Sequence, residues 1–197
     1  MPKRRAPTSS SGPTRLYRVF PWLESAARGQ PGHPFHLPTT QGQGRIDNPE
    51  HYSVFYASDS AAGAVAEAFV NHAVWTSDLF RVPALPGGRR ALAIFSAERI
   101  AVLDLDDARA LLHRRLKPSD VVTRDRLRTR LWSLAAFHER EWGGIRWWSS
   151  HDPDRGSYGL WNIAGLVVLD ISPLDTNHPA VVEAARAMSR VLDPDRG

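Results

Sequence analysis

Four residues spread along the sequence have side chains suited to acting on a phosphorylated glycoside: Arg45, Tyr56, Glu67 and Ser149. A carboxylate stabilises positive charge that develops at an anomeric carbon, as the acidic residues of glycosidases do. A guanidinium binds phosphate oxygens through a planar fork of donors. A tyrosine ring stacks on a flat ligand, and a serine hydroxyl hydrogen-bonds sugar or backbone groups.

These residues lie in three short islands of sequence. Gly44-Arg45 precedes a Tyr-Ala strand, Ala66-Glu67 lies in the next predicted helix, and a late Gly-Ile-x-aromatic-x-Ser motif ends at Ser149. The ordered set, over residues 45–162, resembles the RES-domain family. That resemblance implies a bacterial toxin that is usually encoded beside an Xre-like antitoxin. It also implies an ADP-ribosyltransferase-like fold that acts on NAD⁺.

The resemblance further implies a reaction, cleavage of the nicotinamide–ribose bond of NAD⁺ by a phosphorylase or a glycohydrolase. Glu67, Ser149 and Tyr56 would be catalytic, whereas Arg45, Tyr56 and Trp147 would bind NAD⁺. NAD⁺ is then the substrate, and no metal is expected because the cationic leaving group supplies the driving force. Two alternatives stay open: a protein ADP-ribosyltransferase, and a non-catalytic module that binds NAD⁺ or a partner. The acceptor (water, phosphate or protein) is not determined by the sequence.

The third island departs from the family pattern at two positions. Trp147 stands where family members often have Tyr, so a flat apolar face is kept and a hydroxyl is lost. Ser150 stands where a basic residue is common, which leaves the choice between Ser149 and Ser150 open. Ser149 is preferred because it keeps the motif spacing.

The elements that position these residues are predicted from residue patterns. Alternation and β-branched or aromatic content indicate strands at residues 16–20, 52–57, 91–95, 100–105, 145–148 and 166–169. Helices are expected from the caps at 58–60 to about residue 73, and at residues 107–114, 124–140 and 179–191. In the helix at 124–140, a buried stripe is predicted at Leu127, Leu131, Leu134 and Phe137. The fold expected is α/β or α+β, with a central mixed or split sheet and flanking helices.

Length and composition agree with one domain over residues 15–197, after a disordered basic tail at residues 1–14. The tail carries three of the four net positive charges, so specific nucleic-acid binding is not expected. The absence of cysteine and of a long apolar run favours a cytoplasmic protein that does not enter a membrane. The expected partners are NAD⁺, the antitoxin and further copies of the chain within a toxin–antitoxin complex.

Other chemistries fit the sequence less well. Residues 149–152 contain the residue types of a hydrolase triad, but neighbours on an extended segment point in alternating directions. His138 lacks the second histidine of a zinc-protease helix. Gly42-x-Gly44 is not followed by a helix start, so it is not a dinucleotide-binding or P-loop signature.

Overall fold

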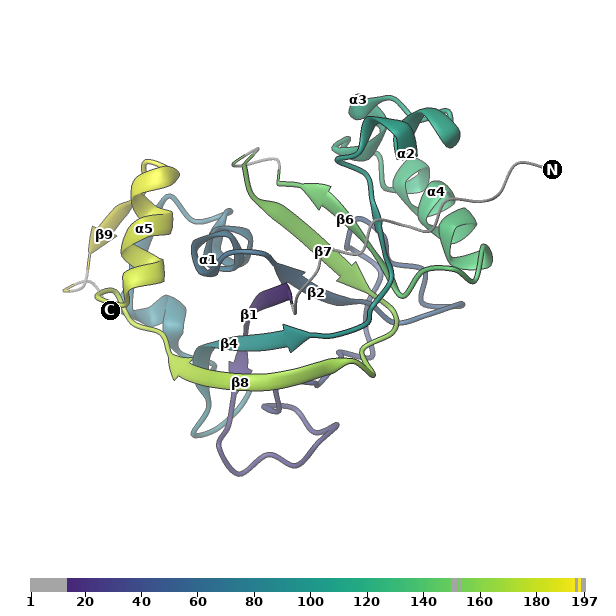
Figure 1. Cartoon of the computed structure of the whole chain (residues 1–197). Coiled ribbons are helices and arrows are strands. Elements are labelled where there is room, and N and C mark those ends of the chain that lie inside the picture. The colour runs from purple at the N-terminus through teal and green to yellow at the C-terminus, as the bar shows by residue number, and fades with distance from the viewer. Residues whose placement is uncertain (1–13, 150–151, 153, 194, 196–197) are drawn as a thin grey trace.

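The computed structural model describes residues 14–149, 152, 154–193 and 195 (Figure 1). Of the predicted tail, Thr14 begins the first strand, and residues 1–13 lie outside the described part. Among the described residues, seven strands form one sheet. Their spatial order is β5 (Val102–Asp104), β6 (Gly144–Trp148), β7 (Gly156–Leu160), β2 (Phe55–Ser58), β1 (Thr14–Trp22), β4 (Arg89–Ala97) and β8 (Leu166–Pro173).

The sheet is mixed and opens near its middle. β5 and β6 are parallel, and the other neighbours are antiparallel. β1 pairs with β4 along its whole length, whereas β1 and β2 are in register only at Tyr17 and Ser58. The two halves of the sheet therefore diverge between β1 and β2, which leaves room there for a pocket.

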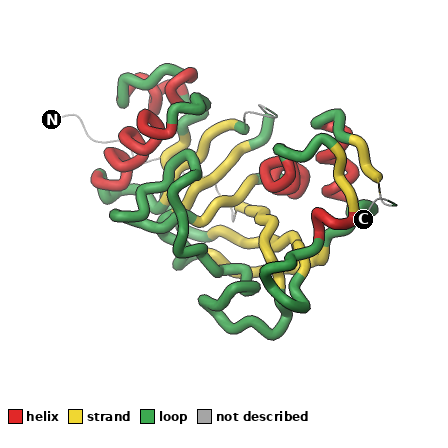
Figure 2. The backbone as a smooth tube through the Cα atoms, turned by 180° about the vertical axis from the view of Figure 1, so that it is seen from behind, coloured by secondary structure: helices red, strands yellow, loops and turns green. Residues whose placement is uncertain are grey.

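The helices form two groups on either side of the strands (Figure 2). One group consists of α1 (Ala61–Phe69) and α5 (Pro179–Ala187), which pack together over a core that includes Trp75, Phe80 and Leu92. Beside them lie β3 (Val74–Thr76) and β9 (Val191–Asp193), a separate parallel pair, and the short 3₁₀ helix η1 (Ser77–Phe80). This group positions Glu67, which α1 carries.

The second group is a helical lobe of α2 (Ala108–His113), α3 (Pro118–Val121) and α4 (Arg126–His138). It packs beside β5 and β6 through Leu111, Val121, Trp132 and Ala136. No described helix has the length and apolar character needed to cross a bilayer.

The predicted mixed α/β fold with flanking helices is confirmed, with differences at several element ends. The strand expected at residues 52–57 begins at Phe55, and the helix expected to reach residue 73 ends at Phe69. Its cap falls within the predicted Ser-Asp-Ser run, because Ser60 Oγ accepts from the Gly63 N–H at 3.1 Å. The helix expected at 179–191 ends at Ala187, and the chain then forms β9.

The predicted buried stripe of α4 is wrong at two of its four positions. Leu127 and Leu131 are 76% and 70% exposed, and Leu134 and Phe137 are only partly buried. The buried face consists of Thr129, Trp132, Ser133 and Ala136. Three of these side chains hydrogen-bond across the interface: Trp132 Nε1 donates to Asp120 O, Thr129 Oγ1 donates to Arg45 O, and Ser133 Oγ accepts from Tyr52. These bonds fix a face that apolar periodicity does not indicate.

Candidate active site

A pocket of about 400 Å³ lies where β1 and β2 diverge, between α1 and the first turn of α4. Four of the five predicted site residues line it, and the fifth, Ser149, adjoins it through its hydrogen bond to Glu67. The lining residues are Tyr17, Arg18, Val19, Gly44, Arg45, Tyr56, Ala57, Ser58, Ala64, Glu67, Ala68, Arg126, Trp147 and Ser157. Residues separated by about a hundred positions in sequence thus meet at one place.

Two serines hold the carboxylate of Glu67. Ser149 Oγ donates to Glu67 Oε1 at 3.0 Å, and Ser157 Oγ donates to the same oxygen at 3.4 Å. Both serines are buried, whereas the Glu67 side chain itself is exposed toward the pocket. Hydrogen bonds to one oxygen limit the carboxylate's rotation and leave Oε2 to face a ligand. The arrangement is suited to presenting a fixed negative charge.

Two arginines line the same pocket as this carboxylate. The half-buried Arg45 donates from Nη1 to Val121 O at 2.6 Å and to Thr123 O at 2.9 Å. Arg126 also lines the pocket, and its Nη1 donates to Thr123 O at 3.3 Å. Burial lowers the pKa of Arg45, and the charge of Arg126 lowers it further, whereas Glu67 raises it. A guanidinium has five N–H donors, so the anchored Arg45 keeps donors for a ligand's anionic oxygens.

The turn that carries Arg45 is held by the buried Asp47. Asp47 Oδ2 accepts from the Gly42 N–H at 2.8 Å and from the Gly44 N–H at 2.7 Å. Its Oδ1 accepts from Tyr56 Oη at 2.6 Å, and Tyr56 Oη accepts in turn from the Ile46 N–H. Burial and the neighbouring Asp47 raise the pKa of Tyr56 well above the usual range. The hydroxyl of Tyr56 therefore joins β2 to the turn that carries Arg45.

An aromatic wall closes one side of the pocket. The Tyr56 and Trp147 rings meet edge to face, with centroids 6.4 Å apart and an interplanar angle of 82°. Trp147 is 5% exposed, and both residues line the pocket. The Trp at this position keeps an apolar surface that can contact a flat ring.

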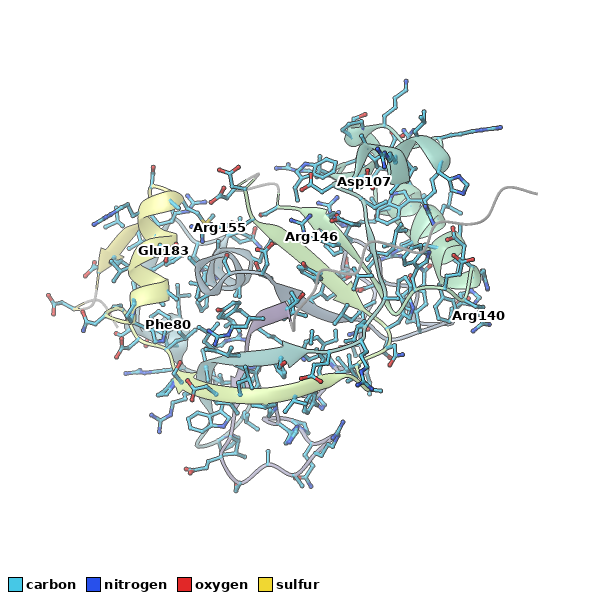
Figure 3. All side chains as sticks on the ribbon, in the orientation of Figure 1. Phe80, Asp107, Arg140, Arg146, Arg155 and Glu183 are labelled. Carbon is cyan, nitrogen blue, oxygen red and sulfur yellow. The ribbon has the colours of Figure 1, made fainter. Side chains whose placement is uncertain are left out.

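The segment that presents Ser149 is tied back to the domain by Arg155. The Ser149 N–H donates to Arg155 O at 2.7 Å. The Arg155 guanidinium binds Asp152 at 2.6 Å and Glu183 of α5 at 2.9 Å, so its side chain points from the start of β7 toward α5 (Figure 3). Ser150 lies outside the described residues, so the geometry here concerns Ser149, which adjoins Glu67.

Three contributors to the site were missed at the level of sequence: Arg126, Ser157 and Asp47. Arg126 belongs to an arginine-rich stretch in which no single arginine stands out. Ser157 lies in β7, which the sequence patterns did not reveal. Asp47 follows Arg45 by two residues in a loop, where no local pattern indicates burial, whereas in the structure it is 3% exposed and binds the turn itself.

Arg18 also lines the pocket, but its guanidinium binds the protein and is not directed at a ligand as those of Arg45 and Arg126 would be. Its guanidinium donates to the carbonyls of Pro34 and His36 and lies 4.4 Å from the centroid of the Phe55 ring. Side chains alternate along a strand, so Arg18 lies with Leu16 and Phe20 on the opposite side of β1 from Tyr17 and Val19. It anchors the loop after β1.

We expect Gly44→Ala to disrupt the turn. A Cβ at Gly44 would lie 2.2 Å from Tyr56 Oη and 2.6 Å from Asp47 Oδ1, and these two atoms are already bound to each other. Overpacking of this kind costs about 1–3 kcal/mol of unfolding free energy. Chemical denaturation should show this loss, whereas Gln43→Ala at the adjacent exposed position should stay within about 0.5 kcal/mol of the wild type. Equal stability of the two variants would contradict the close approach at Gly44.

Comparisons with known proteins concern the domain and its fold. The sequence model of the RES domain matches residues 15–182. Among solved structures, the chain is similar to one in the crystal structure of the M. tuberculosis MbcT-MbcA toxin–antitoxin complex. The two share 16% sequence identity and a TM-score of 0.58, over 90% of each chain. At this identity, the similarity concerns the fold. No curated protein matches the chain by sequence.

Proposed function

The chain belongs to the RES domain family, and from this premise we propose that it is the toxin of a bacterial toxin–antitoxin pair that cleaves the nicotinamide–ribose bond of NAD⁺. The observation that carries the proposal is the pocket itself, which is lined by the Glu67 carboxylate and by two arginines, Arg45 and Arg126, and in which the charge of Glu67 acts on Arg45. NAD⁺ needs both features, because it joins an anionic diphosphate to a cationic glycosidic centre.

Glu67 would stabilise the charge that develops when nicotinamide leaves. Departure of the neutral base from the cationic glycoside concentrates positive charge on the ribose anomeric carbon. A carboxylate held in advance stabilises that charge without reorganising during the reaction. The hydrogen bonds from Ser149 and Ser157 keep Glu67 Oε1 in place, which supports this role.

Arg45 and Arg126 would bind the diphosphate. Charge-assisted bonds from guanidinium groups to phosphate oxygens are stronger than neutral hydrogen bonds, and their planar geometry restricts how the ligand lies. The edge-to-face pair of Tyr56 and Trp147 would form the apolar wall against which a flat ring packs. A volume of about 400 Å³ falls within the range of small-molecule sites.

The proposal extends to partners and location. A toxin that depletes NAD⁺ requires an inhibitor in the cell that makes it, and a small Xre-like antitoxin is the partner we propose. A solved structure similar to this chain comes from a toxin–antitoxin complex, which supports an antitoxin as the partner. We also propose that the protein acts in the cytoplasm, where NAD⁺ is found, and that it oligomerises within the complex.

The reaction is tested by incubating the purified protein with NAD⁺, with and without inorganic phosphate, and identifying the products by mass spectrometry. Release of nicotinamide supports the proposal, and the second product names the acceptor. Free ADP-ribose indicates water, a phosphorylated ADP-ribose indicates phosphate, and a mass added to a protein indicates transfer. If NAD⁺ stayed intact under all conditions, the proposed enzymatic activity would be rejected, and the alternative of a non-catalytic binding module would remain.

We expect EDTA to leave the activity unchanged. The departing nicotinamide is neutral and its bond is already activated by the positive charge of the ring, so no Lewis acid is needed to polarise it. The measurement is the rate of nicotinamide release before and after chelation, with readdition of Mg²⁺ as the control. A strict requirement for a divalent ion would contradict the mechanism.

A further inference from the structure

Helix α4 presents apolar side chains to solvent on the face opposite its buried one. Leu127 and Leu131 are 76% and 70% exposed and lie one turn apart. The exposed residues of α4 recur at helical spacing and form one stripe, which is extended by Arg124, the residue before the helix cap. That stripe consists of Arg124, Leu127, Arg128, Leu131, Ala135 and His138. The inner face is already occupied by Trp132 and its neighbours, so these leucines do not contribute to the core.

The lobe around this stripe is strongly basic. From the start of α2 to the end of α4, residues 108–138 contain eight Lys or Arg and two Asp, a formal charge of +6. The whole chain carries +4, so the rest of the molecule is −2. The lobe projects beyond β6, with Asp107 and Arg140 at its two ends (Figure 3). Leu112 of α2, 80% exposed, belongs to the same lobe.

We propose that the outer face of α4 is a docking surface for an acidic amphipathic segment of a partner protein. Apolar side chains of the segment would cover Leu127 and Leu131, and its carboxylates would pair with Arg124. Arg128 already binds Asp120 at 2.8 Å, but its side chain is 57% exposed and a guanidinium has further donors for a second carboxylate. Leucines that are flanked by arginines on one helix face match a partner helix with the inverse pattern, apolar at its centre and acidic at its edges.

The apolar content of the stripe favours a protein over nucleic acid or membrane. A phosphate backbone would neutralise the arginines but would leave both leucines without contacts. Helices that lie in a membrane interface usually turn a broad apolar face with aromatic residues to the lipid, whereas Trp132 of α4 is buried in the domain. The two leucines would form a small apolar centre of the interface, and the arginines beside them would form its charged rim.

The surface is separate from the pocket, although the same helix serves both. Arg126 lines the pocket, and Thr129 and Arg130 hydrogen-bond the carbonyls of Arg45 and Gly42 from the inner side. A segment on the outer face would therefore stabilise the helix that holds the Arg45 turn without entering the pocket. The docking surface goes beyond the proposed reaction and does not depend on it.

The test uses the full chain and a fluorescein-labelled synthetic helix of about 20 residues, with leucines along one face and glutamates elsewhere. Fluorescence anisotropy should show saturable binding that weakens as salt is added. The double variant Leu127→Ser/Leu131→Ser should weaken binding by about tenfold or more, because it removes both apolar contacts. Arg124→Glu should weaken it as well, through like-charge repulsion.

Matched controls distinguish binding at this surface from nonspecific hydrophobic binding. Leu169→Ser makes the same change at a 53% exposed leucine of β8 and should leave binding unchanged. A peptide with serines in place of its leucines should bind at least about tenfold more weakly to the wild type. Hydrogen exchange should show added protection in residues 124–138 when the acidic peptide is bound.

Four results would overturn the proposal. The first is that the peptide shows no saturable binding, and the second is that the double leucine variant leaves the binding unchanged. The third is tighter binding of single-stranded DNA or phosphatidylserine vesicles that depends on the same leucines. The fourth is self-association in sedimentation velocity that the double variant abolishes, because a second copy would then cover the face. Nicotinamide release is measured separately, so failure of the proposed reaction is distinguishable from failure of this surface.

Discussion

Glu67→Gln is expected to lower kcat for nicotinamide release by about 10² to 10³, with little change in KM. A preorganised charge at a developing cation is worth about 3–4 kcal/mol of transition-state stabilisation, which corresponds to that factor. Glutamine keeps the side chain's size, and its carbonyl oxygen can still accept from Ser149 and Ser157. The variant therefore removes the charge and preserves the geometry. Steady-state kinetics with purified protein supply the measurement.

Two comparisons make this result specific. Glu98→Gln applies the same chemical change at an exposed carboxylate outside the pocket and should keep full activity. Ser149→Ala removes one of the two hydrogen bonds that hold Glu67, so its effect should be smaller than that of the charge change itself. Because the Glu67 side chain is exposed, neither its substitution nor that of Glu98 should move Tm by more than about a degree or two. A Glu67→Gln protein that melts several degrees lower, with unchanged activity per folded molecule, would make Glu67 a structural carboxylate.

The parts of the fold and site that the sequence predicted are those with strong local signals. The Ser-Asp-Ser run caps α1 because serine side chains compete for the first free N–H groups of a helix. Glu67 is a carboxylate among small apolar residues, most of which form the buried face of α1 beside it. The ordered set Arg45, Tyr56 and Glu67 meets at one pocket because adjacent elements carry its members to the same split in the sheet.

The parts that were missed depend on contacts between distant segments. β7 was not predicted because two glycines interrupt it, and glycine is a poor strand former. The structure explains both: a Cβ at Gly159 would lie 2.3 Å from Ile46, and one at Gly156 would lie 2.4 Å from Asp59. With β7 missed, Ser157 could not be assigned to the site. No local pattern reveals a glycine that is required by a neighbour a hundred residues away.

The orientation of α4 was predicted wrongly for a related reason. Its leucines follow a helical period, so periodicity alone places them inside. In the structure, polar side chains on the other face bind the Arg45 turn and the end of α3, and Trp132 fills the space between them. Hydrogen bonding to distant backbone groups thus determined which face of α4 packs. The two leucines that remain exposed, Leu127 and Leu131, belong to the proposed docking surface.

Arg45→Ala is expected to raise KM for NAD⁺ by about 10- to 100-fold and to change kcat less. A charge-assisted hydrogen bond contributes about 1.5–3 kcal/mol, and each 1.4 kcal/mol is a factor of ten. The diphosphate is held before and during bond cleavage, so its loss weakens the ground state and the transition state alike and appears mainly in KM. The measurement is again steady-state kinetics, with NAD⁺ varied over a range that reaches the raised KM.

The structure adds a second consequence that separates this variant from other charge removals. Arg45 Nη1 bonds the carbonyls of Val121 and Thr123, so alanine leaves the buried end of α3 without these donors and should lower Tm by several degrees. Arg45→Lys should restore part of the affinity, because it keeps the charge, but a single ammonium cannot bind both carbonyls and grip phosphate in a fork. Arg109→Ala removes an exposed arginine of α2 and should change neither KM nor Tm. If Arg45→Ala lowered Tm while the folded protein bound NAD⁺ as before, the role of Arg45 would be limited to the hydrogen bonds that join its turn to α3. Arg126 would then remain as the cation that binds the diphosphate.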